Sequence, residues 1–449
     1  MTDSPARRPA RPVRPAALPA HLHARAAALA AVRGVFDTGT PLDAGLAGRP
    51  EWAQMDVRDR AFARALAAAV IRQPGALDAA VGANLDRPLP DTALRARLAL
   101  RCGTAELLIL STPPHAAVDA WVELMGASPE SAGFRKLSNA VLRRVSEKGA
   151  SIFARADPLG DLPDWLAARW SNAWGAPAAR AMAAARSGPP PLDLTARHEA
   201  DPARIASEIG GVVLPTGTIR RTAIGLVEDI AGYKSGDWWV QDAAAALPAR
   251  LLAARRGETV ADLCAAPGGK TLQLAATGAD VIAVELNARR LKRVEANLAR
   301  ARLTARLVAA DAADWRPDAP LDAVLLDAPC TATGTLRRRP DAAWSKREED
   351  VTALARIQAR LLDAAYAMLK PGGRLVFCTC SLEREEGEDQ IPAFLARNPG
   401  AALDPVRAEE LPGLSEALAP QGWVRTRPDM WAEEGGLDGF FIARLVRTA

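Results

Sequence analysis

The chain has 449 residues, about three times the length of a typical domain, so a single small domain is excluded. Hydrophobic residues make up 49% and charged residues 24% of the sequence, which is typical of a folded protein with sizeable cores and excludes wholesale disorder. The formal net charge is only +4, so binding to an anionic partner such as nucleic acid has to be argued from where the positive charges lie.

The first part of the chain predicts a tail followed by a helical domain. Residues 1–20 are rich in Arg and Pro and are expected to form a disordered basic tail. Residues 21–148 are rich in Ala and Leu with helical periodicity, which predicts an all-helical domain. The last clear helical stretch directs Leu137, Val141 and Leu142 toward a core. Its basic side chains, which stay free to face solvent or phosphate, are Arg135, Lys136, Arg143 and Arg144.

The middle of the chain, residues 149–236, changes character and is expected to form a connecting subdomain. Trp165, Trp170 and Trp174 lie on a short helical stretch, where core packing is the simplest interpretation. A Gly-Pro-Pro-Pro segment at 188–191 breaks this stretch, and a strand-like piece follows.

Residues 237–449 alternate short apolar runs with helical stretches, which predicts an α/β domain with a mostly parallel, doubly wound sheet. Strands are expected at 260–262, 281–285, 305–308, 323–327 and 374–379. Helices are expected at 270–276, 288–302 and 346–369. The final segment, 439–446, alternates like an antiparallel edge strand.

A loop of small residues follows the first of these strands and opens a helix. Its residues are Cys264, Ala265, Ala266, Pro267, Gly268, Gly269 and Lys270. Paired glycines let a ligand approach the backbone, and a helix N-terminus offers free N–H groups. Glu285 closes the next strand, where an acid can bind ribose hydroxyls, although a charge near a helix start explains it equally well. Together these features indicate an adenosine-containing ligand.

Acids and thiols follow the later strands. Asp311 and Asp327 are expected at the same carboxyl edge of the sheet, and Asp327 begins the sequence Asp-Ala-Pro-Cys that ends at Cys330. Cys380 follows the fifth strand, so a second thiol arrives at this edge. Cys102 and Cys378 are expected to be buried small hydrophobic residues. The basic segment Leu336–Pro340 would place positive charge beside this crevice, or form a solvated loop.

Three motifs in this order, CAAPGGK at 264–270, DAPC at 327–330 and TCS at 379–381, resemble those of the Sun-type (RsmB-like) RNA cytosine-5-methyltransferases. The helical domain ending in LSNAVLRR resembles the NusB-like RNA-binding module of bacterial members. Gln241-Asp242 and the DGFF sequence at 438–441 match the two flanks of the family's catalytic domain. The resemblance implies a NusB-like helical domain followed by a Rossmann-like class I methyltransferase domain.

The resemblance also implies a reaction. S-adenosylmethionine would donate a methyl group to carbon 5 of a cytosine in small-subunit (16S) ribosomal RNA, with Cys380 as nucleophile and Cys330 in the release step. Asp327 would bind the cytosine amidine edge, with Lys270 nearby. Residues 264–270, Glu285, Asp311 and Asp327 would line the cofactor. Glu285 stands where family members usually have Asp, and Ala312 follows Asp311 in place of the usual Gly.

Two alternatives stay open at this point: the same chemistry on transfer RNA, and a non-catalytic RNA-binding or assembly factor. The expected partner is ribosomal RNA, unassembled or partly assembled. Five scattered cysteines, none in a C-x-x-C pair, and four histidines offer no zinc-ligand spacing, so no metal site is expected. Without a secretory signal or an apolar stretch of about 18 residues, we expect a cytoplasmic monomer that does not contact membranes.

Overall fold

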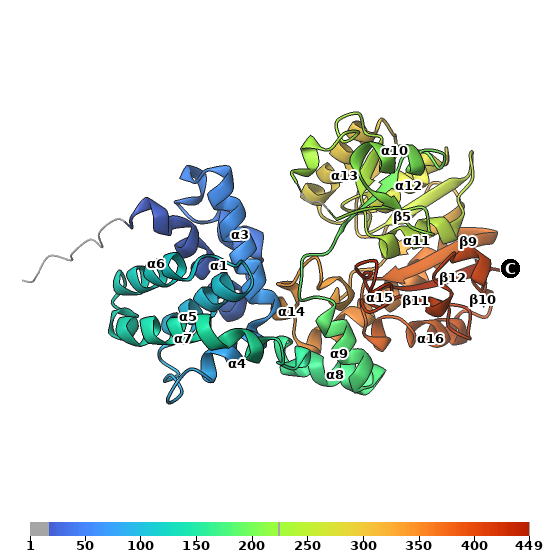
Figure 1. The fold of residues 1–449 in the computed structure, drawn as a ribbon. Helices are drawn as coiled ribbons and strands as arrows, with labels where there is room; N and C mark the ends of the chain where they lie inside the picture. The colour runs from blue at the N-terminus through green and yellow to red at the C-terminus, as the bar shows by residue number, and fades with distance from the viewer. Residues whose placement is uncertain (1–17, 223–224, 449) are drawn as a thin grey trace, which may run out of the picture. The chain divides into compact units, whose positions relative to one another are not determined.

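The computed structural model describes residues 18–222 and 225–448. The chain forms two compact units, drawn in Figure 1: one takes in the residues to 34, 42–70 and 77–154, and the other 35–41, 71–76 and 155 onward. Residues 1–17 of the expected basic tail lie outside the described residues, and Ala20 is the first residue of a 3-10 helix. No described helix is long and apolar enough to cross a membrane.

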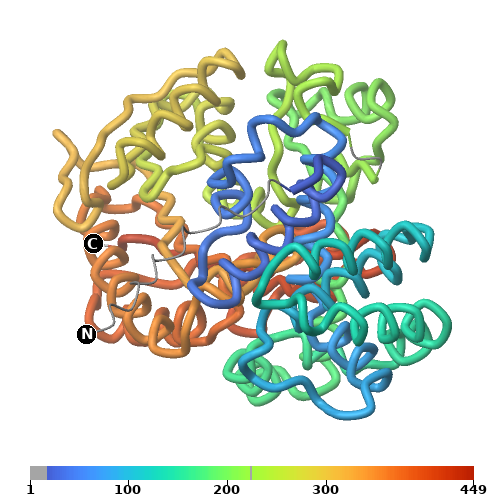
Figure 2. Tube along the Cα trace, turned by 90° about the vertical axis from the view of Figure 1, so that its left-hand side faces the viewer, coloured from blue at the N-terminus to red at the C-terminus, as the bar shows by residue number. Residues whose placement is uncertain are grey.

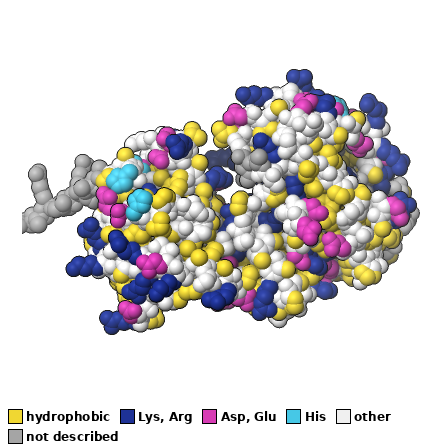
Figure 3. All heavy atoms as spheres, in the orientation of Figure 1, with side chains coloured by type: hydrophobic (Ala, Val, Ile, Leu, Met, Phe, Trp, Pro, Cys, Tyr) yellow, Lys and Arg dark blue, Asp and Glu magenta, His cyan; other side chains and the backbone are white. Residues whose placement is uncertain are grey.

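The described part of the first unit is helical, as predicted. Its last helix, α7, buries Val141, Leu142 and Val145, while Arg135 and Arg143 stay exposed. Figure 3 shows Lys and Arg side chains gathered on part of this unit's surface. The elements up to residue 153 are η1 (Ala20–Leu22), α1 (His23–Thr38), α2 (Leu42–Ala47), η2 (Trp52–Gln54), α3 (Val57–Arg72), α4 (Pro74–Gly82), α5 (Leu94–Leu108), α6 (Pro114–Gly126), η3 (Ala132–Phe134) and α7 (Arg135–Phe153).

The second unit begins with a helical pair and a small sheet. Trp170 is buried with Leu166 and Met182 in one apolar cluster, so the prediction that the tryptophans are core residues is confirmed. The small sheet is antiparallel, in the order β2-β3-β1-β4. The elements are η4 (Pro158–Asp161), α8 (Asp164–Trp174), α9 (Ala176–Ala184), β1 (Leu192–Ala196), α10 (Pro202–Ile209), β2 (Val212–Val213), β3 (Ile219–Arg221), η5 (Val227–Asp229) and β4 (Trp238–Val240).

A larger sheet, ordered β10-β12-β9-β8-β5-β6-β7, forms the centre of this unit. β5 to β9 run parallel, as predicted from their continuous apolar runs. The elements are α11 (Ala243–Leu252), β5 (Thr259–Leu263), α12 (Gly269–Ala276), β6 (Asp280–Glu285), α13 (Ala288–Ala301), β7 (Arg306–Ala309), β8 (Leu321–Asp327), η6 (Thr333–Thr335), α14 (Ala342–Ser345), α15 (Glu348–Ala367), β9 (Leu369–Thr379), η7 (Arg384–Glu386), α16 (Gln390–Arg397), β10 (Ala401–Leu403), η8 (Ala408–Glu410), η9 (Ser415–Ala417), β11 (Val424–Arg425) and β12 (Phe441–Arg447).

The last strand, β12, is antiparallel as predicted, but it is not the edge of the sheet. It pairs with β9 on one side and with the short β10 on the other. Figure 2 shows the red C-terminal segment beside orange stretches of the chain. Local alternation could not reveal this position, because the strands that pair with the outer side of β12, β10 and β11, are only two or three residues long and lie earlier in the chain.

Helices cover both faces of the large sheet, with α11 and α12 on one side and α15 and α16 on the other in Figure 1. Along β8, Ala323 and Leu325 pack in the apolar cluster that contains α11, while Val324 and Leu326 pack in the cluster that contains α15. This alternation follows from the two-residue period of a strand. Because both faces are covered, a ligand can reach the sheet at the carboxyl ends of its strands.

Candidate active site

An ion pair joins the start of α12 to the end of β8. The Lys270 Nζ donates to the Asp327 Oδ2 at 2.8 Å, and the ammonium also lies 5.1 Å from the centre of the Phe440 ring. Burial alone would lower the pKa of Lys270, but the charge and the hydrogen bond of Asp327, together with the neighbouring thiols of Cys378 and Cys380, outweigh it and raise this pKa. Lys270 is therefore a fixed cation at the carboxyl edge of the sheet, as the strand order predicts.

The two predicted reactive thiols meet at the same edge. Asp327 and Cys378 are partners in the parallel register of β8 and β9, so the residues that follow each strand emerge side by side. The Cys330 Sγ lies 3.4 Å from the Cys380 Sγ, and both side chains are only partly buried. Hydrogen bonding to Cys380, burial, and the negative charges of Cys380 and Glu386 raise the pKa of Cys330 well above its usual value. The Cys330 sulfur therefore keeps its proton.

Cys378 is buried, as predicted, but it also touches the site. Its Sγ lies 3.5 Å from the Asp327 Oδ1. Burial and the Asp327 charge raise the pKa of Cys378, so this thiol is a neutral packing group beside the ion pair.

The loop at 264–270 is held by two side chains of α13. The Asn297 Nδ2 donates to the Pro267 carbonyl at 2.9 Å, and the Arg290 guanidinium donates to the Ala266 carbonyl at 2.8 Å. Cys264 and Gly268 have φ values of 62° and 107°, so the chain turns sharply at both positions before α12 begins. The contacts leave the N-terminus of α12 at the carboxyl edge of the sheet, as the motif predicts.

The two acids predicted to line the cofactor beyond the loop, Glu285 and Asp311, lie at the end of β6 and just after β7. Glu285 is 3% exposed, and its carboxylate accepts hydrogen bonds from the Ala266 N–H at 3.3 Å and the Asn287 N–H at 3.0 Å. Glu285 is therefore tied to the loop and to its own turn. Asp311 is exposed and accepts from the Ala313 N–H at 2.9 Å. The structure thus brings Glu285 to the loop and leaves Asp311 open to solvent.

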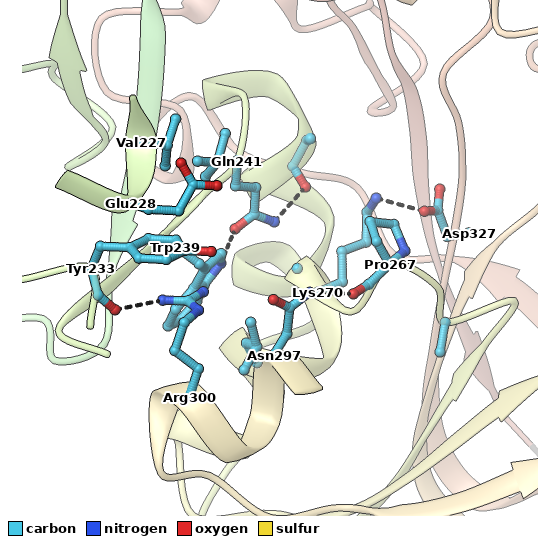
Figure 4. Close-up of a pocket in the computed structure, with 15 residues that line it drawn as sticks. Val227, Glu228, Tyr233, Trp239, Gln241, Pro267, Lys270, Asn297, Arg300 and Asp327 are labelled. Carbon is cyan, nitrogen blue, oxygen red and sulfur yellow. Dashed lines mark hydrogen bonds and ion pairs between the residues drawn. The ribbon is translucent and has the colours of Figure 1, made fainter. Parts of the chain in front are cut away.

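A cavity of about 450 Å³ lies in front of the Lys270–Asp327 pair, as Figure 4 shows. Its far wall, which the sequence did not predict, contains Tyr233, Trp239 and Arg300. The Arg300 guanidinium lies 4.3 Å from the centre of the Tyr233 ring. The only sequence signal for this wall was the Trp-Trp pair just before Gln241. The predicted site residues that line the cavity are Ala265, Pro267, Gly269, Lys270 and Asp327.

Two buried acids near the site were also missed. Asp262 lies in β5 between the buried Ala261 and Leu263, accepts a hydrogen bond from the Thr271 hydroxyl at 2.5 Å, and has its pKa raised by burial to about 7. Glu386 is fully buried close behind the cysteine loops. It lies in the acidic run 383–389, whose composition is typical of a solvated surface segment. The sequence alone does not show which acid of this run is buried.

The expectation for the basic segment 336–340 is only partly right. Arg337 is 1% exposed, and Arg338 forms ion pairs with Asp242 at 2.6 Å and Asp438 at 3.2 Å. Arg339 is exposed and is the member of this run that is open to a phosphate. Arg338 therefore joins Asp242, at the start of α11, to Asp438, just before β12, and the Arg337 guanidinium is buried without a hydrogen-bond partner among the described residues, so neither presents its charge to RNA.

The strand order of the large sheet and the loop after β5 define the class of protein: a Rossmann-like methyltransferase fold that follows a helical unit. Residues 249–446 match the family model described as 16S rRNA methyltransferase RsmB/F, and residues 22–147 match the NusB family. The chain therefore belongs to the RsmB/F family of 16S ribosomal RNA methyltransferases, as the motifs predicted.

Relatives of this chain match its sequence over nearly its whole length. It is 39% identical over 442 residues to the ribosomal RNA small subunit methyltransferase B of Xanthomonas campestris pv. campestris, covering 95% of this chain and 97% of that protein. It is 35% identical to the protein of the same name from Pseudomonas putida, covering 95% and 99%. A crystal structure of a methyltransferase homolog protein from Pyrococcus horikoshii is 26% identical, with a TM-score of 0.53, covering 64% of this chain and 95% of that one.

Proposed function

We propose that this protein methylates carbon 5 of a cytosine in 16S ribosomal RNA through a covalent bond between Cys380 and the cytosine. The observation that carries the proposal is the pair of partly buried cysteines, with sulfurs 3.4 Å apart, at the same edge of the sheet as the Lys270–Asp327 ion pair. Family membership supports methyl transfer to 16S ribosomal RNA. The thiol pair supports the carbon that is modified and the covalent route.

S-adenosylmethionine, when bound, supplies an electrophilic methyl group attached to a sulfonium. The groups at the carboxyl edge fit this molecule in their chemistry. The N-terminus of α12 offers N–H donors suited to a carboxylate, and Glu285 and Asp311 offer acceptors suited to the ribose hydroxyls and the adenine amine. Residues 264–270, Glu285, Asp311 and Asp327 are therefore proposed to hold the methyl donor.

Cys380 is assigned the first covalent step. Carbon 5 of cytosine is a poor nucleophile until a thiolate adds to carbon 6. The motif resemblance assigns this addition to Cys380, which directly follows β9 at the carboxyl edge of the sheet. Asp327, held by Lys270, is proposed to bind the amidine edge of the base and to support protonation of the ring nitrogen. The base has to leave its stack to reach these groups.

Cys330 is assigned the release step. Cys330 lies 3.4 Å from the sulfur that is bonded to carbon 6, so it is placed to act as the base once it has given its proton to solvent. The Cys330 thiolate then takes the proton from carbon 5. The electron pair of that C–H bond forms the 5,6 double bond, the carbon 6–sulfur bond breaks, and Cys380 leaves as a thiolate.

The test is methylation by the purified protein with labelled S-adenosylmethionine and either protein-free 16S ribosomal RNA or bulk transfer RNA. Nuclease digestion and mass spectrometry locate the 5-methylcytosine. Label in one ribosomal cytosine is the expected result. Label in transfer RNA would support the same reaction on a different RNA substrate. No label in either RNA would favour a non-catalytic RNA-binding role.

A further inference from the structure

We propose that Glu386 is a positioning residue that holds the Cys330 loop and the Cys380 loop in one arrangement, so that Cys330 stays beside the bond that must break during release. This inference rests on the proposed function. Glu386 touches neither sulfur; it acts through the residues that flank them. Its side chain is fully buried at the end of η7, six residues after Cys380.

Glu386 accepts hydrogen bonds from Thr331, the residue that directly follows Cys330. The Thr331 N–H donates to the Glu386 Oε1 at 3.0 Å, and the Thr331 hydroxyl donates to the Oε2. Gln358 of α15 links Glu386 to the residue before Cys330. Its Nε2 donates to the Glu386 Oε1 at 3.0 Å and to the Pro329 carbonyl at 2.9 Å. The residues before and after Cys330 are therefore both bound to one polar network.

The same network reaches the Cys380 loop. The Thr331 hydroxyl lies 3.1 Å from the Ser381 hydroxyl, and Ser381 directly follows Cys380. The Thr379 hydroxyl, directly before Cys380, donates to the Glu386 carbonyl at 2.9 Å. Both thiols thus sit between residues that are tied, within one or two hydrogen bonds, to Glu386.

A carboxylate is required at this position because both of its oxygens accept. Oε1 accepts from a main-chain N–H and an amide, and Oε2 accepts from a hydroxyl. A glutamine has nearly the same shape but only one acceptor oxygen. With its NH₂ group in place of Oε1, it would face the donors of Thr331 and Gln358. With its NH₂ group in place of Oε2, it would lie against the Thr331 N–H, 3.2 Å away, and the Thr331 hydroxyl would have to turn from donor to acceptor. An unpaired buried donor costs about 1–3 kcal/mol, which is enough to let the loops separate.

The neighbouring acid provides a matched control. Glu385 lies on the same 3-10 turn, is 43% exposed at its side chain, and pairs with Arg169 at 2.7 Å. The hydrogen bonds of its carboxylate go to Arg169 and not to the cysteine loops. Glu385→Gln removes an acid from the same turn and leaves the network around Cys330 intact.

The experiment compares Glu386→Gln, Thr331→Val and Glu385→Gln with the wild type. It measures kcat and KM on 16S ribosomal RNA, the affinity for S-adenosylmethionine, the thermal transition, and the fraction of protein that stays bound to methylated RNA after denaturation. For Glu386→Gln we expect kcat to fall by on the order of 10- to 100-fold, with KM and cofactor affinity within about twofold and more protein trapped on RNA. Thr331→Val should change the same quantities in the same direction by less, and Glu385→Gln should match the wild type.

Wild-type kcat and wild-type adduct levels in both Glu386→Gln and Thr331→Val would overturn the inference. So would a loss of cofactor affinity in proportion to kcat, because that result indicates general damage to the fold. If Glu386→Gln does not fold, Thr331→Val decides: a raised adduct fraction supports the inference and an unchanged one rejects it. A wild type that makes no 5-methylcytosine would reject the proposed function and this inference together, whereas equal Glu386→Gln and Glu385→Gln activities would reject the inference alone.

Discussion

The Cys330 Sγ lies 3.4 Å from the Cys380 Sγ, although 50 positions separate the two residues in the chain. The reason is the parallel pairing of β8 with β9, which places Asp327 beside Cys378 and sends both following loops out at one edge. Sequence motifs indicate that both thiols reach this edge. The contact between them supports the proposal that they act on one base in succession.

Replacing either thiol should separate the two covalent steps. Cys380→Ala should lower methylation by on the order of 10³-fold or more and form no RNA adduct, because no nucleophile reaches carbon 6. Cys330→Ala should still form the bond to RNA and should accumulate as a denaturation-resistant complex. Denaturing gel electrophoresis with labelled RNA measures both effects. Equal turnover by the two variants would refute the assigned roles.

Asp327→Asn should damage catalysis more than stability. The carboxylate is 30% exposed and its pair with Lys270 holds the groups proposed to meet the base, so we expect kcat/KM to fall by about 10²-fold or more. The matched control is Asp322→Asn, at the other end of β8, where Asp322 pairs with Lys370 at 2.5 Å. Steady-state methylation assays distinguish the two variants, and similar losses in both would show that the Asp327 effect is structural.

Asp262 should make the stability of this unit depend on pH. Burial raises the pKa of its carboxyl to about 7 in the folded protein, whereas the unfolded value is about 3.9. The folded state therefore binds the proton more strongly, so this contribution is fully present below about pH 4 and is lost as the pH rises to about 7. The urea midpoint of the wild type relative to Asp262→Asn should fall over this range and level off above it. A pH-independent difference would contradict the assignment.

Replacing Arg338 should lower protein stability, whereas replacing its neighbour Arg339 should weaken RNA binding. Arg338→Ala leaves the carboxylates of Asp242 and Asp438, which are 3% and 4% exposed, without their partner, and should cost about 3–5 kcal/mol of stability. Arg339→Ala should leave the thermal transition unchanged, weaken RNA binding, and reduce the slope of log affinity against log salt by about one. Binding titrations at several salt concentrations test the second effect. An unaltered salt slope would place Arg339 outside the RNA path.

Gly334→Ala should disturb the Cys380 loop. A Cβ at Gly334 would lie 2.0 Å from the Gly439 carbonyl oxygen, and the Gly334 N–H donates to the Cys380 carbonyl at 3.0 Å. The backbone has to shift, so both the thermal transition and methylation should fall. Gly188→Ala is the control, because a Cβ there meets nothing within 4 Å. Calorimetry and the methylation assay should separate the two, and a fully active Gly334→Ala protein would show that this close approach is not needed.

Much of the fold and of the site could be predicted because both depend on local pattern. The apolar runs of β5, β6 and β8 and the periodicity of α13 are visible in the residues themselves, since burial on both faces or on one stripe dictates their spacing. The carboxyl ends of parallel strands meet at one edge, so the loop at 264–270, Asp327 and Cys330 could be assigned to one place.

The charge partners of the buried side chains could not be predicted from local pattern. The residues show only that Arg337, Arg338 and Arg339 form a basic run and that residues 383–389 contain many acids. Which of these side chains turn inward depends on groups far away in the chain: Asp242 lies 96 positions from Arg338, and Thr331 lies 55 positions from Glu386. The free energy of a buried charge is set by the partners that surround it, and long-range packing supplies those partners.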